Sequence, residues 1–212
     1  MLIGVAPRSS VAAPTANIIH VNANAPTGGD GASWATAYKY LQDALAAVAD
    51  DDEIWVAAGI YYPDEDEGGN VTANDPLASF SLKTGLKDVR IYGGFAGGET
   101  SRDQRDWDAN LTVLSGDIEQ NDSTVNGVLQ DTNGIVGTNA NNVLIGRELD
   151  GVVLDGLTIT GGDVEAQTPS FFETGGGGIL LEETLDVLLE NLTVRGNRAL
   201  STGQTFGAQG GG

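Results

Sequence analysis

The amino-acid sequence predicts an all-β solenoid that begins with an amphipathic capping helix. Three observations lead to this prediction: an internal repeat, short apolar strands separated by Gly-rich bends, and one Ala-rich helical stretch near the N-terminus. The 212 residues include 31 glycines, with 40% hydrophobic and 19% charged residues. Few charges and many glycines favour strands and tight turns over long solvated helices.

The repeat is the strongest of these observations. Residues 149–162 align without a gap on residues 184–197, at an offset of 35, and the same offset carries the glycines 175–177 onto 210–212. Each unit holds three short apolar strands, which cannot close a hydrophobic core alone. Stacking successive units would bury their Leu, Ile and Val faces in one continuous column.

The alignment also predicts which side chains and bends stack. We expect Leu154 to lie on Leu189 and Ile159 on Val194. Gly156 and Asn191 fall at bends that need left-handed or otherwise restricted dihedrals, which Gly and Asn tolerate best.

The Ala-rich stretch predicts a helix over about 34–48. Its apolar residues recur at spacings of four and three, which places them on one helix face; they are Trp34, Tyr38, Leu41, Leu45 and Val48. Such a helix would cover the end of the solenoid's hydrophobic column. Binding of a partner protein is the alternative role for it.

The domain organisation follows from these elements. Residues 1–16 are predicted to form an N-terminal tail, and residues 17–212 the N-terminal part of the solenoid, with regular 35-residue repeats from about 149. The register would start another buried strand at the glycines 210–212. We therefore expect the chain to be truncated at its C-terminus, because an open strand edge is a poor natural end.

Composition excludes several classes of partner. Asp and Glu total 30 against 10 Lys and Arg, for a formal net charge of −20, so nucleic acid and anionic membrane surfaces would be repelled. The chain has no cysteine, which excludes disulfides and thiolate metal sites. No apolar stretch approaches the roughly 18 residues that span a bilayer, so we expect no direct membrane insertion. Residues 1–16 make a poor signal peptide, because Arg8 interrupts the apolar start.

Three stretches carry a resemblance to a known family. They are His20–Asn22 through Gly28–Ala35 to Asp52–Gly59, then Ile91–Phe95 with Arg105–Trp107 and Leu114–Ile118, and finally the Leu-Asp-Gly-Leu-Thr-Ile-Thr-Gly-Gly repeat followed by Gly175–Ile179. With them the chain resembles bacterial right-handed parallel β-helix repeat proteins of pectin-lyase-like fold, including surface and adhesin-like members. The fold class implied is all-β, a right-handed parallel β-helix solenoid with an N-terminal amphipathic capping helix.

The resemblance also brings polysaccharide lyases and hydrolases into consideration. The hydrolase motifs are absent: the single histidine, His20, is followed by Val21, and the run 50–52 is expected to form a solvated acidic turn. Arg195 stands where the other repeat has Thr160, on a surface-facing position. The sequence therefore predicts no catalytic residues and no bound cofactor of an enzyme. The tryptophans Trp34, Trp55 and Trp107 are expected to pack rather than to bind sugars.

One acidic loop is a candidate metal site. Asp117, Glu119 and Asn121 alternate as oxygen ligands with Asp122 beside them, a spacing similar to that of calcium loops, although the glycine and the distal glutamate of an EF-hand are absent. The sequence predicts Ca²⁺ as the ion such a site would take. An empty, solvated acidic loop is the competing interpretation.

These features favour a non-catalytic extracellular or cell-surface scaffold for adhesion or assembly with copies of itself or with other proteins. One rival is a carbohydrate-active enzyme or carbohydrate-binding module, which would make polysaccharide the partner. Another rival is a structural subunit of a larger complex, docked through its C-terminal strand edge or its acidic loops.

Overall fold

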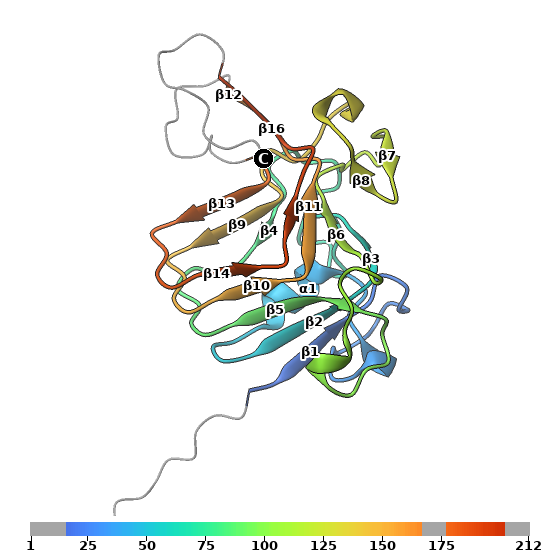
Figure 1. Cartoon of the computed structure of the whole chain (residues 1–212), viewed down its shortest axis with the longest axis vertical. Helices are drawn as coiled ribbons and strands as arrows, with labels where there is room; N and C mark the ends of the chain where they lie inside the picture. Colours follow the sequence, from blue (N-terminus) through green and yellow to red (C-terminus); the bar gives the residue numbers. More distant parts are fainter. Residues whose placement is uncertain (1–15, 167–176, 202–212) are drawn as a thin grey trace, which may run out of the picture.

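The structure, a computed structural model, describes residues 16–166 and 177–201, and these residues fold mainly into parallel β-sheets (Figure 1). The first sheet has the order β1-β2-β5-β10-β14, formed by Ile18–Val21, Glu53–Ala57, Arg90–Phe95, Val153–Asp155 and Leu188–Glu190. The second has the order β15-β11-β6-β3, formed by Thr193–Val194, Leu157–Thr160, Thr112–Ser115 and Gly59–Tyr61. The third has the order β13-β9-β4, formed by Ile179–Glu182, Leu144–Arg147 and Phe80–Ser81.

The remaining elements are short. Strands β12 (Asp163–Ala166) and β16 (Arg198–Ser201) form a parallel pair, and β7 (Thr124–Val125) and β8 (Val128–Leu129) form an antiparallel hairpin. The helices are α1 (Leu41–Ala47) and the 3₁₀ turns η1 (Trp34–Thr36), η2 (Arg102–Gln104) and η3 (Thr132–Gly134). Within the described ranges no helix is long and apolar enough to cross a membrane.

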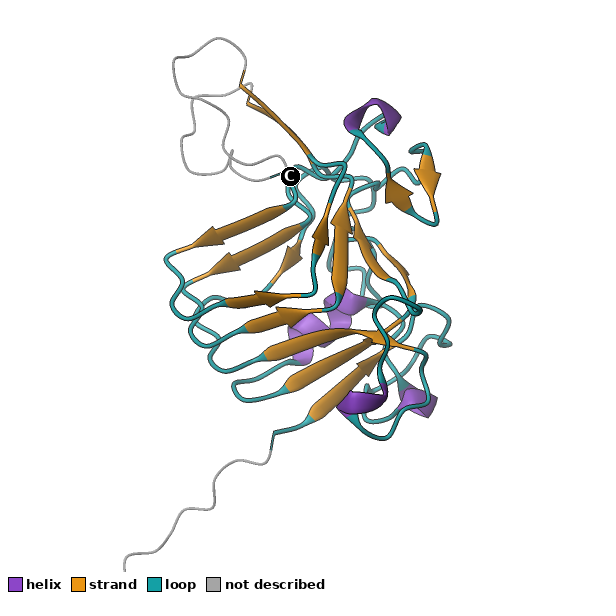
Figure 2. Ribbon diagram, in the orientation of Figure 1, coloured by secondary structure: helices purple, strands orange, loops and turns teal. Residues whose placement is uncertain are grey.

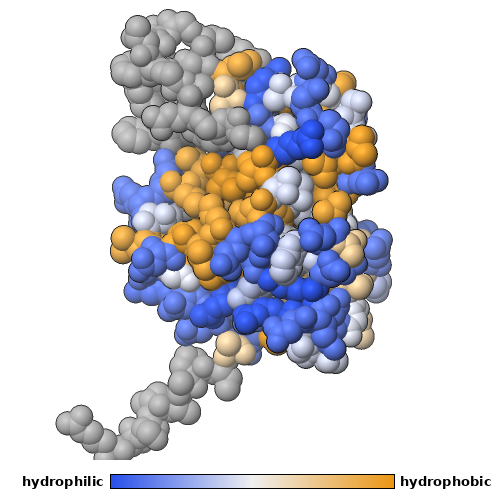
Figure 3. Space-filling view, in the orientation of Figure 1, coloured by the Kyte–Doolittle hydropathy of each residue, from blue (hydrophilic) through white to orange (hydrophobic). Residues whose placement is uncertain are grey.

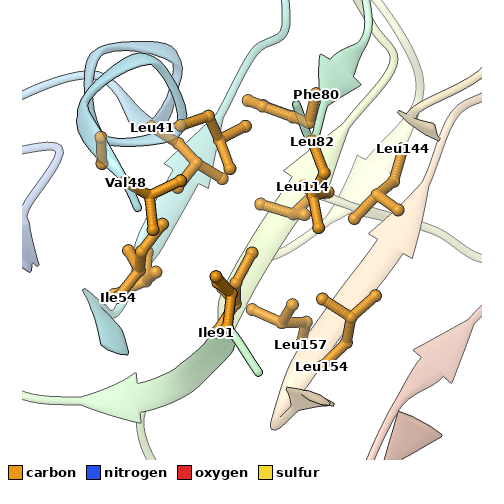
Figure 4. Packing of buried hydrophobic residues seen from close by; sticks show 14 of the residues in the cluster. Leu41, Val48, Ile54, Phe80, Leu82, Ile91, Leu114, Leu144, Leu154 and Leu157 are labelled. Carbon is orange, nitrogen blue, oxygen red and sulfur yellow. The ribbon is translucent and has the colours of Figure 1, made fainter. Parts of the chain in front are cut away.

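The hydrophobic core lies between the three larger sheets. Ile19, Ile54, Ile91 and Leu154 occupy one register position across the first sheet, and all four are buried. Figure 4 shows Ile54, Ile91 and Leu154 on one side of this core and residues of the other sheets opposite them. Each fully buried Leu or Ile contributes roughly 1.5–3 kcal/mol relative to an exposed one.

The prediction of a right-handed parallel β-helix solenoid is wrong. The strands form several separate and mainly parallel sheets, and none of the sheets in the described parts is closed or a solenoid. The reason lies in the spacing of paired strands: Glu53 pairs with both Ile18 and Arg90, but the next partner of Arg90 is Val153. The segment between Arg90 and Val153, which includes the antiparallel β7–β8 hairpin, interrupts the 35-residue spacing.

The pairing predicted within the last two units is confirmed. Leu154 pairs with Leu189 in the first sheet, and Ile159 pairs with Val194 in the second. Gly156 and Asn191 both have left-handed backbone conformations, with φ of 74° and 49°. The glycines 210–212, on which the second part of the repeat alignment rests, lie outside the described residues.

The predicted capping helix over 34–48 is also wrong as a single element. Trp34–Thr36 form one 3₁₀ turn, and the α-helix begins only at Leu41. Between them Tyr38 is held in an extended conformation by a bridge to Val21 of β1, which a continuous helix could not form. The helix that remains still buries its apolar face, with Leu41, Ala44 and Leu45 in the core beside β1 and β4.

Candidate functional site: an exposed sheet edge

The two edges of the five-stranded sheet differ in how far the rest of the chain covers them. On the β1 side, His20 donates its backbone N–H to the carbonyl of Gly31 at 2.8 Å, and the N–H of Tyr38 donates to the carbonyl of His20 at 2.9 Å. The loop that contains Gly31 and Tyr38 therefore covers the second half of the β1 edge, around His20. The covered half of the edge cannot pair with another chain.

The opposite side ends in three outermost strands, β13, β14 and β15, one from each of the larger sheets. We call these three strands the outer edge. Figure 2 shows them on the same side of the molecule, away from β1. One surface of the protein therefore presents strand edges of three parallel sheets.

Apolar side chains are exposed around this outer edge. Leu185 is 66% exposed, Leu188 46%, Leu189 44% and Val194 37%, and we call these four residues the edge patch. In Figure 3 hydrophobic surface gathers over the region of β13 and β14. Leu188 and Leu189 are successive residues of β14 and point to opposite faces of the sheet, so Leu189 lies on the core side and Leu188 on the outer side.

The edge patch continues two rows of the core. Leu189 follows the fully buried Leu154 in register, and Val194 follows the fully buried Ile159. Because parallel strands in register place paired side chains on the same face, Leu189 and Val194 extend the core outward to the solvent. A further strand on this side would bury them as β14 and β15 bury their inner neighbours.

The backbone of β14 is arranged for such an addition. The N–H of Leu188 donates to the carbonyl of Val152, and the carbonyl of Glu190 accepts from the N–H of Gly156, so both residues bond toward β10. Backbone groups alternate in direction along a strand. The N–H and carbonyl of Leu189 consequently point away from β10, toward the outer side.

The outer edge has an acidic rim, which we define as Glu183, Asp186 and Glu190. All three are exposed, and among the described residues none of them takes part in an ion pair. The neighbouring Glu182 differs, because its carboxylate accepts a hydrogen bond from Arg147 at 2.7 Å. The surface around the edge patch is therefore apolar at its centre and negatively charged at its margin.

The carboxylates of the predicted calcium loop accept hydrogen bonds from N–H groups of the same loop. The carboxylate of Asp117 accepts the backbone N–H groups of Asn121 and Asp122 at 3.0 and 2.9 Å, and Glu119 accepts the side-chain amide of Asn121 at 3.0 Å. The four predicted ligands thus lie in one loop, but they bond to one another. In the parts of the chain that the structure describes, no group of three or more His, Cys, Asp or Glu residues could hold a metal ion.

Hydrogen bonds within the chain also hold the carboxylate of Asp122. Its carboxylate accepts the backbone N–H of Val136 at 2.6 Å and the side-chain amide of Asn139 at 2.8 Å. Burial raises the pKa of Asp122 above its ordinary value, and the neighbouring carboxylate of Asp117 adds to the rise. These contacts join the 117–122 loop to the segment before β9.

The other candidate polar residues are structural. Asp52, expected in a solvated turn, is buried and accepts the backbone N–H groups of Asn17 and Ala49, both at 3.0 Å. His20 donates its Nδ1–H to the carbonyl of Gly31 at 3.1 Å, and burial lowers the pKa of its imidazole. Neither residue faces a second group with which it could perform acid–base chemistry in the described structure.

The tryptophans mainly pack, as the sequence predicts. Trp55 is buried and stacks on Phe95 with ring centroids 4.7 Å apart, and Trp34 lies 5.5 Å from the same ring. Trp107 is 36% exposed, and the guanidinium of Arg105 lies 4.8 Å from its ring centroid. The cation therefore occupies one side of the ring that a sugar would need.

Two features of the structure had no clear signal in the sequence. The Leu and Val residues of the outer edge are exposed, although their sequence pattern predicts burial. The repeat pattern cannot distinguish an inner strand of a sheet from an outermost one. The buried ion pair of Arg105 with Asp155 joins a loop to β10, and nothing in the local pattern of Arg105 indicates that partner.

Comparison with known proteins gives no relative. No protein-family model matches the chain, and neither the curated proteins nor the solved structures include a significant match. The resemblance to pectin-lyase-like proteins stays a prediction from the motifs that carry it.

Proposed function

We propose that the chain is part of a non-catalytic scaffold for adhesion or assembly, and that its outer edge accepts a further β-strand. The observation that carries this proposal is the contrast between the two sides of the sheets. The β1 edge is covered around His20 by the chain's own loop, whereas the outer edge exposes Leu189 and Val194 in direct continuation of the core. Addition of a strand to an exposed edge is a recurring mode of protein recognition.

A scaffold outside the cell is the setting that we propose for this module. The strongly acidic composition suits solubility. A docking edge requires only that the parallel sheets hold its strands in place. A protein of this kind can take part in adhesion or assembly without a catalytic side chain.

The test uses a synthetic strand peptide as the probe. A labelled peptide with the sequence of residues 184–196 supplies the strand residues of β14 and β15, and 0.5 M NaCl screens the charges on both sides. We expect anisotropy to report binding to the wild-type chain and none to the double variant Leu189→Lys, Val194→Lys. The matched control is Val125→Lys, because Val125 is 58% exposed but lies on the β7–β8 hairpin.

The result has a clear reading in both directions. Binding that is lost only in the edge variant supports docking at the outer edge. Absence of binding to the wild type, or equal binding to all variants, overturns the proposal. Circular dichroism of each variant establishes that the substitutions leave the sheets folded.

Two rivals have their own measurements. Turnover of an acidic or neutral polysaccharide that is abolished by changing one carboxylate would replace the scaffold with an enzyme. Calcium binding at Asp117, Glu119, Asn121 and Asp122 requires these oxygens to exchange their N–H donors for the ion. A rise in Tm at millimolar Ca²⁺ that is lost in Asp117→Ala would support this site, and an unchanged Tm would count against it.

A further inference from the structure

The segment between β6 and β9 contains two Asn-Gly pairs, Asn126-Gly127 and Asn133-Gly134. An asparagine that precedes glycine is chemically labile, because glycine has no side chain to shield its backbone nitrogen. This nitrogen can attack the side-chain amide carbon of the asparagine. The two pairs share this local chemistry, so the fold decides how far each of them reacts.

Asn126 and Gly127 form the tip of the β7–β8 hairpin. Asn126 is exposed, and both residues have left-handed backbone conformations, with φ of 53° and 77°, as in the two-residue turns that join antiparallel strands. Among the hydrogen bonds of the described residues, none is donated by the N–H of Gly127 and none involves the side chain of Asn126. Both reacting groups are therefore free.

The tip of the hairpin is held by few contacts. Its two strands contribute two residues each, and both residues of β7 are exposed. Gly127 lies against the side chain of Ile60 in β3, which is itself 37% exposed. Segments with few buried contacts open locally at a small cost in free energy. Asn126 can therefore leave its turn conformation and bring its amide carbon to the nitrogen of Gly127.

The second pair lies in η3, where hydrogen bonds hold it. The N–H of Gly134 donates to the carbonyl of Asp131 at 3.3 Å, and the N–H of Asn133 donates to the carboxylate of Asp131 at 2.8 Å. The carbonyl of Gly134 also accepts the N–H of Ser123 at 2.9 Å. The attacking nitrogen is thus engaged, and η3 must unwind before the pair can react.

We propose that Asn126 is a site of spontaneous deamidation and that the fold directs this reaction to Asn126 instead of Asn133. The nitrogen of Gly127 loses its proton to base and bonds to Cγ of Asn126, while the bond from Cγ to the side-chain nitrogen breaks and ammonia leaves. Water then opens the cyclic imide at either of its carbonyls, which yields aspartate or isoaspartate. The reaction consumes water, releases ammonia and adds a negative charge to the tip of the hairpin.

The experiment measures both sites in the same sample. The purified chain is incubated in mildly alkaline buffer, and peptide mapping by mass spectrometry follows deamidation at Asn126 and Asn133 over time. In the folded chain we expect Asn126 to react at least about tenfold faster, the factor that a modest difference in local opening produces. In urea the two rates should become similar, because neither pair is then protected.

Two variants locate the cause of the difference. Asp131→Ala removes the carboxylate that caps η3, so it should speed the reaction of Asn133 by about fivefold, the usual effect of losing such a cap on a local equilibrium. It should leave the rate at Asn126 unchanged. Asn126→Gly keeps the left-handed turn and should abolish the fast reaction without changing the rate at Asn133.

Several results would overturn the proposal. Equal rates at the two sites of the folded chain, or a faster reaction at Asn133, would do so. Lack of reaction at Asn126 during a period in which the unfolded chain deamidates would have the same meaning. A ratio of rates that is the same with and without urea, or an unchanged rate at Asn133 in Asp131→Ala, would show that the fold does not select the site.

Discussion

Arg105 and Asp155 form the most enclosed of the four ion pairs within the described ranges, with side chains 9% and 5% exposed. The guanidinium also lies 4.9 Å from the ring centroid of Tyr92 and 4.8 Å from that of Trp107. Removal of one partner from a buried pair leaves an uncompensated charge. Arg105 thus fastens the loop before β6 to the outer face of the first sheet.

Arg105→Ala should lower the free energy of unfolding by about 3–5 kcal/mol because Asp155 would stay buried without its cation. Urea denaturation measures this loss. The control is Arg102→Ala, since Arg102 is 45% exposed and lies 3.6 Å from Glu53, and an exposed pair contributes about 1 kcal/mol or less. Equal losses in the two variants would contradict the assignment of Arg105 as a buried anchor.

Glu148 and Glu183 occupy matching left-handed positions, both with φ of 52°. A side chain with a Cβ costs roughly 1–2 kcal/mol in this conformation, and glycine avoids the cost. Glu148→Gly should therefore leave the protein unchanged or stabilise it by up to about 1 kcal/mol, after the larger entropy loss of glycine on folding. Glu190→Gly, in a strand with no such conformation, should destabilise it; a chemical melt that ranks the variants the other way would refute this explanation.

His20 gives a dependence of stability on pH. Burial lowers its pKa below the ordinary 6.5, although the carbonyl of Gly31 opposes the shift. Between the folded pKa and 6.5 the unfolded chain binds more protons, so the free energy of unfolding falls as the pH drops through this window. Urea midpoints at pH 7.5, 6.5 and 5.5 should show the decline, and His20→Gln should flatten it, because the chain has one histidine.

At the scale of elements, the loop over β1 depends on close packing at Gly31. A Cβ built there would lie 2.6 Å from the ring of Tyr38, and φ is +72°. Gly31→Ala should loosen the loop and expose the amide of His20, which hydrogen exchange detects. Gly85→Ala is the control, since Gly85 also has positive φ, at +80°, but nothing lies within 4 Å of its Cβ position. Similar exchange of the His20 amide in both variants would contradict the role of the Gly31–Tyr38 packing in holding the loop.

The sequence predicts local pairing much better than the arrangement of sheets. The alignment of Leu154 with Leu189 specifies a register, because apolar side chains and bend residues recur together. It cannot specify how the chain between Arg90 and Val153 folds, because that stretch has no repeat. The helix over 34–48 failed for a related reason: Tyr38 pairs with β1, and this distant contact outweighs the helical periodicity.

The candidate site shows the same division. Leu189 and Val194 are recognisable as strand residues, but their exposure depends on their place at the outside of the sheets. Asp117 is recognisable as an acidic loop residue, whereas its use as an acceptor for two backbone N–H groups depends on the turn that follows it. Composition and spacing determine which groups are available, and the tertiary fold determines which of them remain free.

At the scale of the whole molecule, charge opposes the attraction between outer edges. The net charge of −20 disappears near the pI of about 4.1. We expect sedimentation velocity to show association as the pH approaches this value, because repulsion no longer separates the exposed apolar edges. Leu189→Lys, Val194→Lys should suppress the association more than Val125→Lys does. Equal association of the variants would show that the outer edge is not the surface involved.

The β7–β8 hairpin has a practical consequence. Its tip, Asn126-Gly127, is held by its own antiparallel pairing, while the parallel sheets are completed by strands before and after it. A foreign peptide inserted between Asn126 and Gly127 would lengthen a hairpin that already lies outside the parallel sheets. We expect an epitope inserted there to be presented at the surface and the paired strands to stay intact, if Gly127 keeps its contact with Ile60 of β3.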